Sequence, residues 1–202
     1  MDETKRMVDS YEVQQEILIG KVEVLLGIDQ TKSDSPYMVC YCTRNNSLGV
    51  EQFYEAAMGA DYLEAMNDFI SRVQQEINEL KAERASFETS MSPFTKEQCQ
   101  PIKDEMRIDN QVVVIRSERL RPEYHTANHQ LVLALSGFGT HAYSRGRAVY
   151  ALNLYSGEEI RWNREDILGI IKPEHMPEWA KDTLNQHKVD RQNRQNNRET
   201  AR

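Results

Sequence analysis

The chain has 202 residues, of which 39% are hydrophobic and 28% charged, and its formal net charge is −7. Its longest apolar runs span only a few residues, as at 112–115, far short of the roughly 20 that a membrane-spanning helix needs. The charged start, Met1-Asp-Glu-Thr-Lys-Arg, lacks the apolar stretch of a secretory signal. Three cysteines are an odd and sparse set, which argues against a disulfide framework. We therefore expect a cytoplasmic protein without a membrane segment.

The charge is divided unevenly along the chain. Residues 1–99 hold 9 Lys and Arg against 18 Asp and Glu, whereas residues 100–202 hold 16 against 14. The acidic half should repel nucleic acid and attract a protein surface that is built to hold nucleic acid. The alternative is that the acidity serves only solubility. We favour a binding protein over an enzyme.

The first half predicts a sheet followed by a long helix. Apolar residues alternate with polar ones over 11–19 and 22–26 around a turn at Gly20-Lys21, and a third strand at 37–42 places Met38, Cys40 and Cys42 on one face. Asp61 can cap a helix whose apolar residues recur at helical spacing from Tyr62 to Leu80. Residues 1–95 are thus predicted to form a three-stranded antiparallel sheet covered by one long helix.

The second half predicts a small β-rich domain over 105–188, after a boundary near 90–106. Strands are expected at 111–117, 130–136, 147–155, 159–162 and 166–171. Pro173 opens a C-terminal helix over 174–188, and the polar residues 189–202 are predicted to be a disordered tail because they can bury little apolar area. The predicted fold class of the chain is α+β.

Cysteines and histidines offer one candidate metal site. Cys40 and Cys42 can place two sulfur atoms near one ion, and Cys99 with His129 would complete a tetrahedral zinc set. The plainer alternative is that the cysteines are small buried strand residues. His125 and His129 would share a face only in a helix, where with His141 they would serve a metal-dependent hydrolase; the alternative is that they are hydrogen-bonding loop residues.

The most distinctive segment is rich in glycine and arginine. It runs Ser136-Gly-Phe-Gly and then Tyr143-Ser-Arg-Gly-Arg, which predicts a shaped loop after a strand. A phosphate cradle would need a helix after the glycines, whereas a strand follows here. Tyr143, Arg145 and Arg147 can contact RNA or form a protein-binding hot spot, and the sequence leaves both readings open.

Several segments, such as Arg161-Trp-Asn-Arg-Glu-Asp, resemble small accessory proteins carried on conjugative elements and plasmids of Gram-positive gut bacteria. The matching stretches are spread over most of the length of the chain and lie at 37–42, 48–50, 94–99, 120–134, 137–139, 144–150, 153–158, 161–169 and 173–180. That group includes anti-restriction and anti-CRISPR factors, so the resemblance implies a mobile-element protein that evades host defence in the bacterial cytoplasm.

The resemblance and the charge pattern together favour an anti-CRISPR protein. Such an inhibitor would bind a type II RNA-guided DNA endonuclease, with or without its guide RNA, and block nucleic-acid loading or cleavage. The acidic helix residues Glu76, Glu79 and Glu83 are the candidate contacts on this reading. The alternatives are an RNA- or DNA-binding accessory protein that uses Tyr143, Arg145 and Arg147, and a metal-dependent hydrolase.

Overall fold

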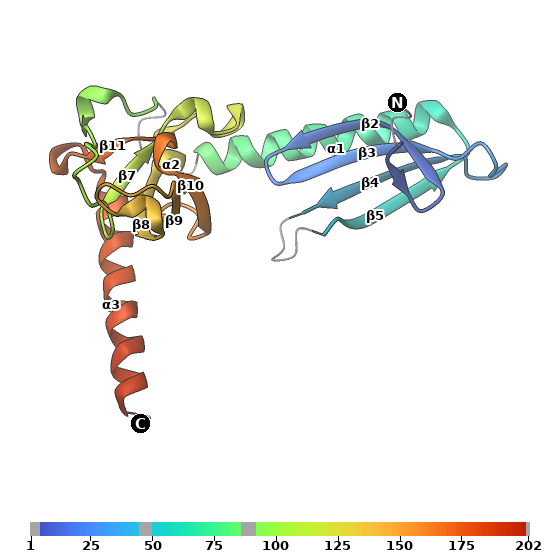
Figure 1. The fold of residues 1–202 in the computed structure, drawn as a ribbon. Coiled ribbons are helices and arrows are strands. Elements are labelled where there is room, and N and C mark those ends of the chain that lie inside the picture. The colour runs from blue at the N-terminus through green and yellow to red at the C-terminus, as the bar shows by residue number, and fades with distance from the viewer. Residues whose placement is uncertain (1–4, 45–49, 86–91, 201–202) are drawn as a thin grey trace. The chain divides into compact units, whose positions relative to one another are not determined.

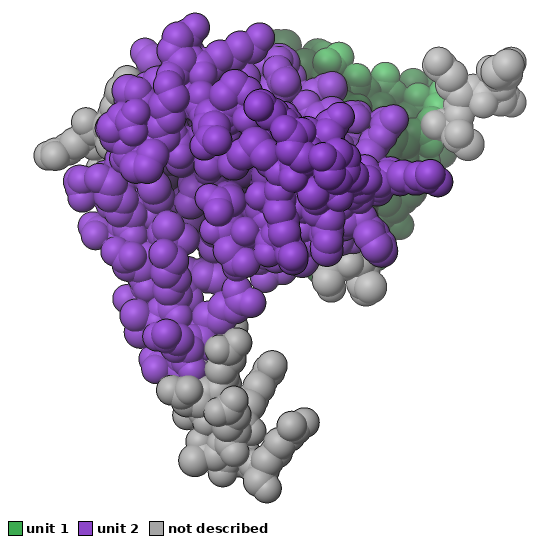
Figure 2. All heavy atoms as spheres, turned by 60° about the vertical axis from the view of Figure 1, so that its left-hand side comes forward, with its two compact units in different colours: residues 1–88 green, residues 89–202 purple. Residues whose placement is uncertain are grey.

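The computed structural model describes residues 5–44, 50–85 and 92–200, and it divides the chain into two compact units (Figures 1 and 2). Unit 1 comprises residues 1–88 and unit 2 residues 89–202. Each unit contains a β-sheet and at least one helix, so the predicted α+β class is confirmed. Among the described residues, no helix is long and apolar enough to cross a membrane. The N-terminal residues 1–4 and the start of the predicted connection, at 90–91, lie outside the described residues.

The sheet of unit 1 has five strands, not the predicted three. Its antiparallel order is β1-β2-β3-β4-β5, with bounds Met7–Val8, Tyr11–Ile19, Val22–Ile28, Tyr37–Thr43 and Gln52–Gly59. Strands β2 to β4 are the predicted ones. Strand β1 was missed because two residues carry no periodicity, and β5 was missed because seven of its eight residues are exposed and show no apolar alternation.

Helix α1, Tyr62–Ala85, covers one face of this sheet (Figure 1). The predicted cap is present, since the backbone N–H of Glu64 donates to Asp61 Oδ1 over 2.9 Å. Phe69 is the buried anchor of the helix, and it packs against Val24, Leu26, Val39 and Tyr41 of the central strands. The other face of the same strands buries Met38, Cys40 and Cys42, as the alternation predicted.

Unit 2 is built on a six-stranded antiparallel sheet in the order β10-β9-β8-β7-β11-β6. Its strands are β6 (Cys99–Gln100), β7 (Val112–Ile115), β8 (Leu131–Ser136), β9 (Ala148–Asn153), β10 (Glu159–Asn163) and β11 (Ile167–Ile171). Helix α2 is Ala127–Gln130, and 3-10 turns lie at Lys96–Gln98, Ser117–Arg119, Pro122–Tyr124, Phe138–Thr140, Arg164–Asp166 and Pro173–His175. Five of the strands fall where the sequence predicted them, because each alternates strongly or is apolar throughout.

The C-terminal helix α3 runs from Glu178 to Thr200, longer than predicted. Its first turns pack Trp179, Ala180 and Leu184 on one face of the sheet. The remainder of α3 runs to Thr200, within the segment 189–202 for which the sequence predicted a disordered tail. Residues 189–202 contain no Gly or Pro, and their four Arg and two Gln favour helix even without an apolar face.

Candidate functional site

The predicted zinc ligands belong to two different units. Cys40 and Cys42 are buried in β4 of unit 1, whereas Cys99 and His129 belong to unit 2. Burial raises the pKa of Cys40 and of Cys99 to about 11, which makes the metal-binding thiolate form costly. The four-residue zinc site stays a prediction, and the geometry adds no support to it.

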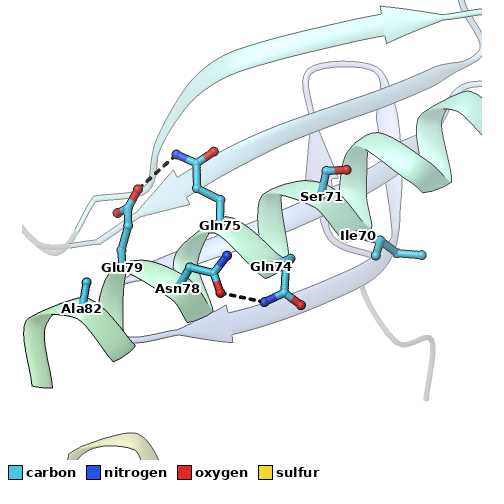
Figure 3. A pocket seen from close by; sticks show the side chains of 7 residues that line it. All are labelled: Ile70, Ser71, Gln74, Gln75, Asn78, Glu79 and Ala82. Carbon is cyan, nitrogen blue, oxygen red and sulfur yellow. Dashed lines mark hydrogen bonds between the residues drawn. The ribbon is translucent and has the colours of Figure 1, made fainter. Parts of the chain in front are cut away.

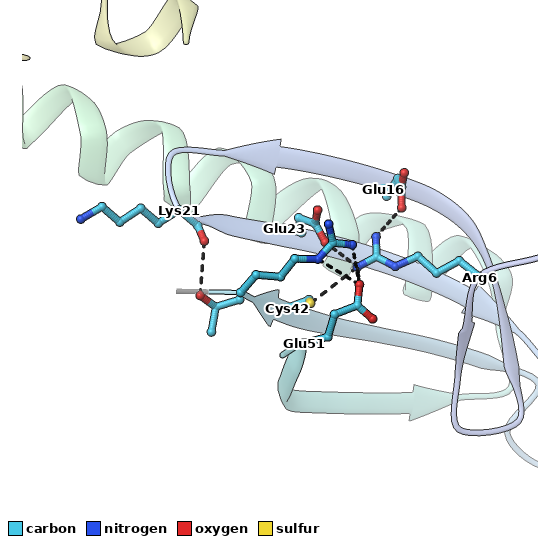
Figure 4. A network of polar contacts seen from close by, with 8 residues as sticks. Arg6, Glu16, Lys21, Glu23, Cys42 and Glu51 are labelled. Atoms are coloured by element: carbon cyan, nitrogen blue, oxygen red, sulfur yellow. Dashed lines mark hydrogen bonds and ion pairs between the residues drawn. The ribbon is translucent and has the colours of Figure 1, made fainter. Parts of the chain in front are cut away.

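Cys42 instead belongs to a polar network around Arg6 (Figure 4). Potential metal-ligand atoms of Glu23, Cys42 and Glu51 lie within 4.8 Å of one another, the only such group among the described residues. Arg6 Nη2 donates to Glu23 Oε2 over 2.5 Å and to Glu51 Oε1 over 2.8 Å, and it lies 3.6 Å from Cys42 Sγ. The Arg6 guanidinium is thus the cation that these carboxylates contact, and the structure shows the cluster as an ion-pair network.

The histidines do not assemble into a catalytic group. His125 Nε2 lies 2.9 Å from the carbonyl oxygen of Leu120, and His129 Nδ1 lies 2.8 Å from Thr126 Oγ1. Helix α2 begins only at Ala127, so His125 and His129 do not share a helix face. In the part of the chain that the structure describes, no histidine belongs to a cluster of three possible metal ligands. The geometry adds no support to the hydrolase alternative.

Glu76, Glu79 and Glu83 follow one flank of α1, at the helical spacing that places them above one another. The flank runs beside β5, because Arg72, one turn before Glu76, donates from Nη1 to the carbonyl oxygen of Glu55 over 2.6 Å. Burial, and then the neighbouring carboxylates of Glu79 and Glu55, raise the pKa of Glu76. We call Glu55, Glu76, Glu79 and Glu83 the acidic flank. Within it, the carboxylates of Glu55 and Glu79 are close enough to that of Glu76 to repel it.

Exposed side chains border the acidic flank on both sides. The solvent face of α1 carries an open depression that Figure 3 shows, lined by Ile70, Ser71, Gln74, Gln75, Asn78, Glu79 and Ala82. On the other side, β5 is the edge strand of the sheet and exposes Tyr54 on the face that α1 covers; Phe53 and Met58, which pair with Cys42 and Met38, are exposed on the opposite face. The sequence analysis missed this apolar edge because it assigned no strand there.

In unit 2 the structure brings the predicted Tyr143, Arg145 and Arg147 together in an exposed loop. Tyr143 is 76% exposed, and Arg147 forms an exposed ion pair with Glu165 over 3.2 Å. The loop is shaped by glycine, as predicted. A Cβ on Gly139 would lie 2.3 Å from the carbonyl oxygen of Arg147, and one on Gly146 would lie 2.4 Å from Phe138 Cβ.

Arg164 holds the base of this loop from within the unit. Its Nη1 donates to the carbonyl oxygen of Gly139 over 2.6 Å and lies 3.4 Å from that of His141. Its Nη2 donates to the carbonyl oxygens of Lys103 and Met106 over 3.1 and 2.7 Å. The sequence could not predict this role of Arg164, because nothing in the local pattern reveals carbonyl acceptors some 20 to 60 residues away.

Comparison with protein-family models, with curated protein sequences and with solved structures finds no significant match to this chain. The functional argument therefore depends on two surfaces: the acidic flank of unit 1 and the glycine-arginine loop of unit 2.

Proposed function

We propose that the protein is a binding protein that inhibits a type II RNA-guided DNA endonuclease of a bacterial host. The acidic flank of unit 1 would enter the basic groove of the enzyme and block nucleic-acid loading or cleavage. The observation that carries the proposal is the mutual proximity of Glu55, Glu76 and Glu79. Burial is the largest cause of the raised pKa of Glu76, and the two neighbouring carboxylates raise this pKa further. The class of target comes from the sequence resemblance.

The electrostatics of unit 1 favour a cationic partner. Residues 1–88 hold 8 Lys and Arg against 17 Asp and Glu, a formal net charge of −9. Among the described residues, no Lys or Arg is in ion-pair contact with the carboxylates of Glu55 or Glu76. A cationic groove would relieve the repulsion between these groups and would also steer the encounter over a distance of about a Debye length.

The neighbouring apolar side chains supply contact area. Tyr54 on β5 and Ile70 on α1 lie beside the flank and are 39% and 57% exposed, whereas Phe53 and Met58, 38% and 59% exposed, lie on the opposite face of β5. Protein interfaces combine such aromatic and Met contacts at the centre with a polar rim, and an exposed edge strand can also donate main-chain hydrogen bonds to a partner. A purely solubilising acidic surface would have no need of these exposed apolar groups.

The test is a plasmid-cleavage assay with a type II RNA-guided endonuclease, in which the protein is added before or after the guide RNA. The test variant is Glu76→Gln with Glu79→Gln and Glu83→Gln, which removes three negative charges from the acidic flank. The matched control is Glu105→Gln with Glu118→Gln and Glu174→Gln, which removes three exposed charges from unit 2. Because both variants have the same net charge, they separate the flank from the overall charge.

We expect the wild-type protein and the control variant to block cleavage, with inhibition that weakens as salt rises. The flank variant should lose inhibition while its circular dichroism spectrum stays unchanged. Equal inhibition by both variants would move the contact surface away from the acidic flank. Complete cleavage in the presence of excess wild-type protein would reject the proposed function for the enzyme tested.

A further inference from the structure

Unit 2 exposes a group of aromatic rings around its glycine-arginine loop. Phe138 and Tyr143 are each 76% exposed, and Tyr150 on β9 is 49% exposed. Two of the rings are tied to the loop glycines: a Cβ on Gly146 would touch Phe138, and one on Gly137 would lie 3.3 Å from the ring of Tyr150. Rings of this size are normally buried, so three in one exposed region call for a partner.

The loop that carries most of these rings has only positively charged side chains. Residues 137–150 contain Arg145 and Arg147 and no Asp or Glu. Arg161 on β10 is exposed and lies directly opposite Tyr150 in the β9–β10 pairing. The nearest acidic partner with a direct contact is Glu165, whose ion pair with Arg147 is exposed at both ends and therefore weak. The surface thus combines flat rings with positive charge.

The loop is held in place before any ligand arrives. Arg164 donates a hydrogen bond to the carbonyl oxygen of Gly139. The backbone N–H of Tyr143 donates to the carbonyl oxygen of Asp104 over 2.7 Å. Tyr143 has a φ of +52°, an unfavourable value for a tyrosine that the surrounding contacts maintain. A loop fixed in this way loses little conformational entropy on binding.

We propose that this surface, formed by Phe138, Tyr143, Arg145, Arg147, Tyr150 and Arg161, binds single-stranded nucleic acid. Bases stack on the exposed rings and the arginines contact the phosphate backbone, as in proteins that bind single strands without reading a sequence. A duplex hides the faces of its bases, so it offers the surface only phosphates. We disfavour a protein partner because the loop itself, residues 137–150, contains two arginines and no Asp or Glu, and the carboxylates of Asp104 and Glu165 lie only at its border.

The inference does not depend on the proposed function. Residues 89–202 hold 17 Lys and Arg against 15 Asp and Glu, net +2, whereas unit 1 is strongly acidic. The two surfaces therefore suit ligands of opposite charge. The flank variant Glu76→Gln with Glu79→Gln and Glu83→Gln should bind single strands at least as well as wild type, so failure of one proposal leaves the other standing.

The test is fluorescence anisotropy with the full-length protein and three labelled probes: a uridine oligonucleotide, a thymidine oligonucleotide and a mixed-sequence duplex. We expect both single strands to bind more tightly than the duplex, with affinity that falls as salt rises. A difference between the uridine and thymidine probes identifies RNA or DNA as the preferred strand.

Two pairs of variants locate the site. Tyr143→Ala should weaken single-strand binding about five- to a hundredfold, whereas Tyr143→Phe keeps the ring and should bind nearly as wild type. Arg161→Glu should weaken binding, whereas Lys181→Glu, the same charge change on α3, should not. The matched aromatic control is Tyr62→Ala in unit 1, a ring that is 42% exposed.

Three results would overturn the proposal: no binding of either single strand, equal binding of duplex and single strands, or undiminished binding by Tyr143→Ala. Tryptophan fluorescence checks the folding of each unit 2 variant, because Trp162 and Trp179 both belong to this unit. A misfolded Tyr143→Ala is replaced in the test by Tyr143→Leu, which keeps an apolar side chain without a π face.

Discussion

Replacing Arg164 with Met should loosen the glycine-arginine loop and destabilise unit 2. The guanidinium makes four contacts to carbonyl oxygens, two of them as short as 2.6 and 2.7 Å. Burial lowers the pKa of Arg164 and the nearby Asp104 raises it, yet an arginine stays charged at neutral pH. Hydrogen bonds to a charged group contribute about 1.5–3 kcal/mol each when buried, so with partial solvent access we expect a loss of about 2–4 kcal/mol.

Urea unfolding followed by tryptophan fluorescence measures this loss, since both tryptophans report on unit 2. The expected free-energy change lowers the urea midpoint by about 1–3 M. Arg164→Lys should fall between wild type and Arg164→Met, because an ammonium group cannot reach carbonyls on both sides as the planar fork does. An unchanged midpoint for Arg164→Met would refute the reasoning, since it would mean that water replaces all four contacts without loss.

Three further outcomes are expected. Gln130 is buried and joins the N–H of Phe94 to the carbonyl of Ile115, so Gln130→Glu should cost about 2–4 kcal/mol at pH 7 in urea unfolding. The deficit should shrink as pH falls, because the buried carboxyl has a raised pKa in the folded state and can donate again once protonated; a pH-independent deficit contradicts this. Arg6→Met should destabilise unit 1 by about 1–3 kcal/mol in thermal melts followed by circular dichroism, and adding Glu23→Gln should restore part of the loss. If the four predicted ligands hold zinc, elemental analysis of chelator-free protein should find stoichiometric metal, and its absence ends that prediction.

Many of the strands and helices could be predicted from the local spacing of apolar residues in the sequence. The alternation around Gly20 has the two-residue period of a strand, and the run at Val112–Ile115 is short and entirely β-branched, as is typical of a buried strand. The cap at Asp61 and the stripe through Phe69 predicted α1 equally well. Strand β5 escaped notice because an edge strand that buries almost nothing needs no apolar alternation; its backbone pairing with β4 alone defines it. The C-terminal helix was underestimated because a missing apolar face was equated with disorder.

The candidate surfaces were predicted in part. The sequence named Glu76, Glu79 and Glu83 as an acidic helix face and Tyr143 with its arginines as a shaped loop, because each set is close along the chain. The structure adds Glu55 to the acidic flank, and it adds Tyr150 and Arg161 to the surface around the glycine-arginine loop. These three residues belong to neighbouring strands. Their place beside the predicted residues follows from strand pairing, which depends on register and not on local composition.

By itself, the sequence determined the α+β class, the unequal charge of the two halves and the face of β4 on which Cys40 and Cys42 lie, since composition and periodicity are local properties. Only the tertiary structure decided what those residues meet. Four separate segments supply Arg6, Glu23, Cys42 and Glu51. The contacts of Arg6 with the two carboxylates make this group an ion-pair network in the structure. Periodicity assigns a residue to one face of its helix or strand. Which residue it contacts there depends on how distant segments pair, and the free energy of that pairing depends on the packing of the whole unit.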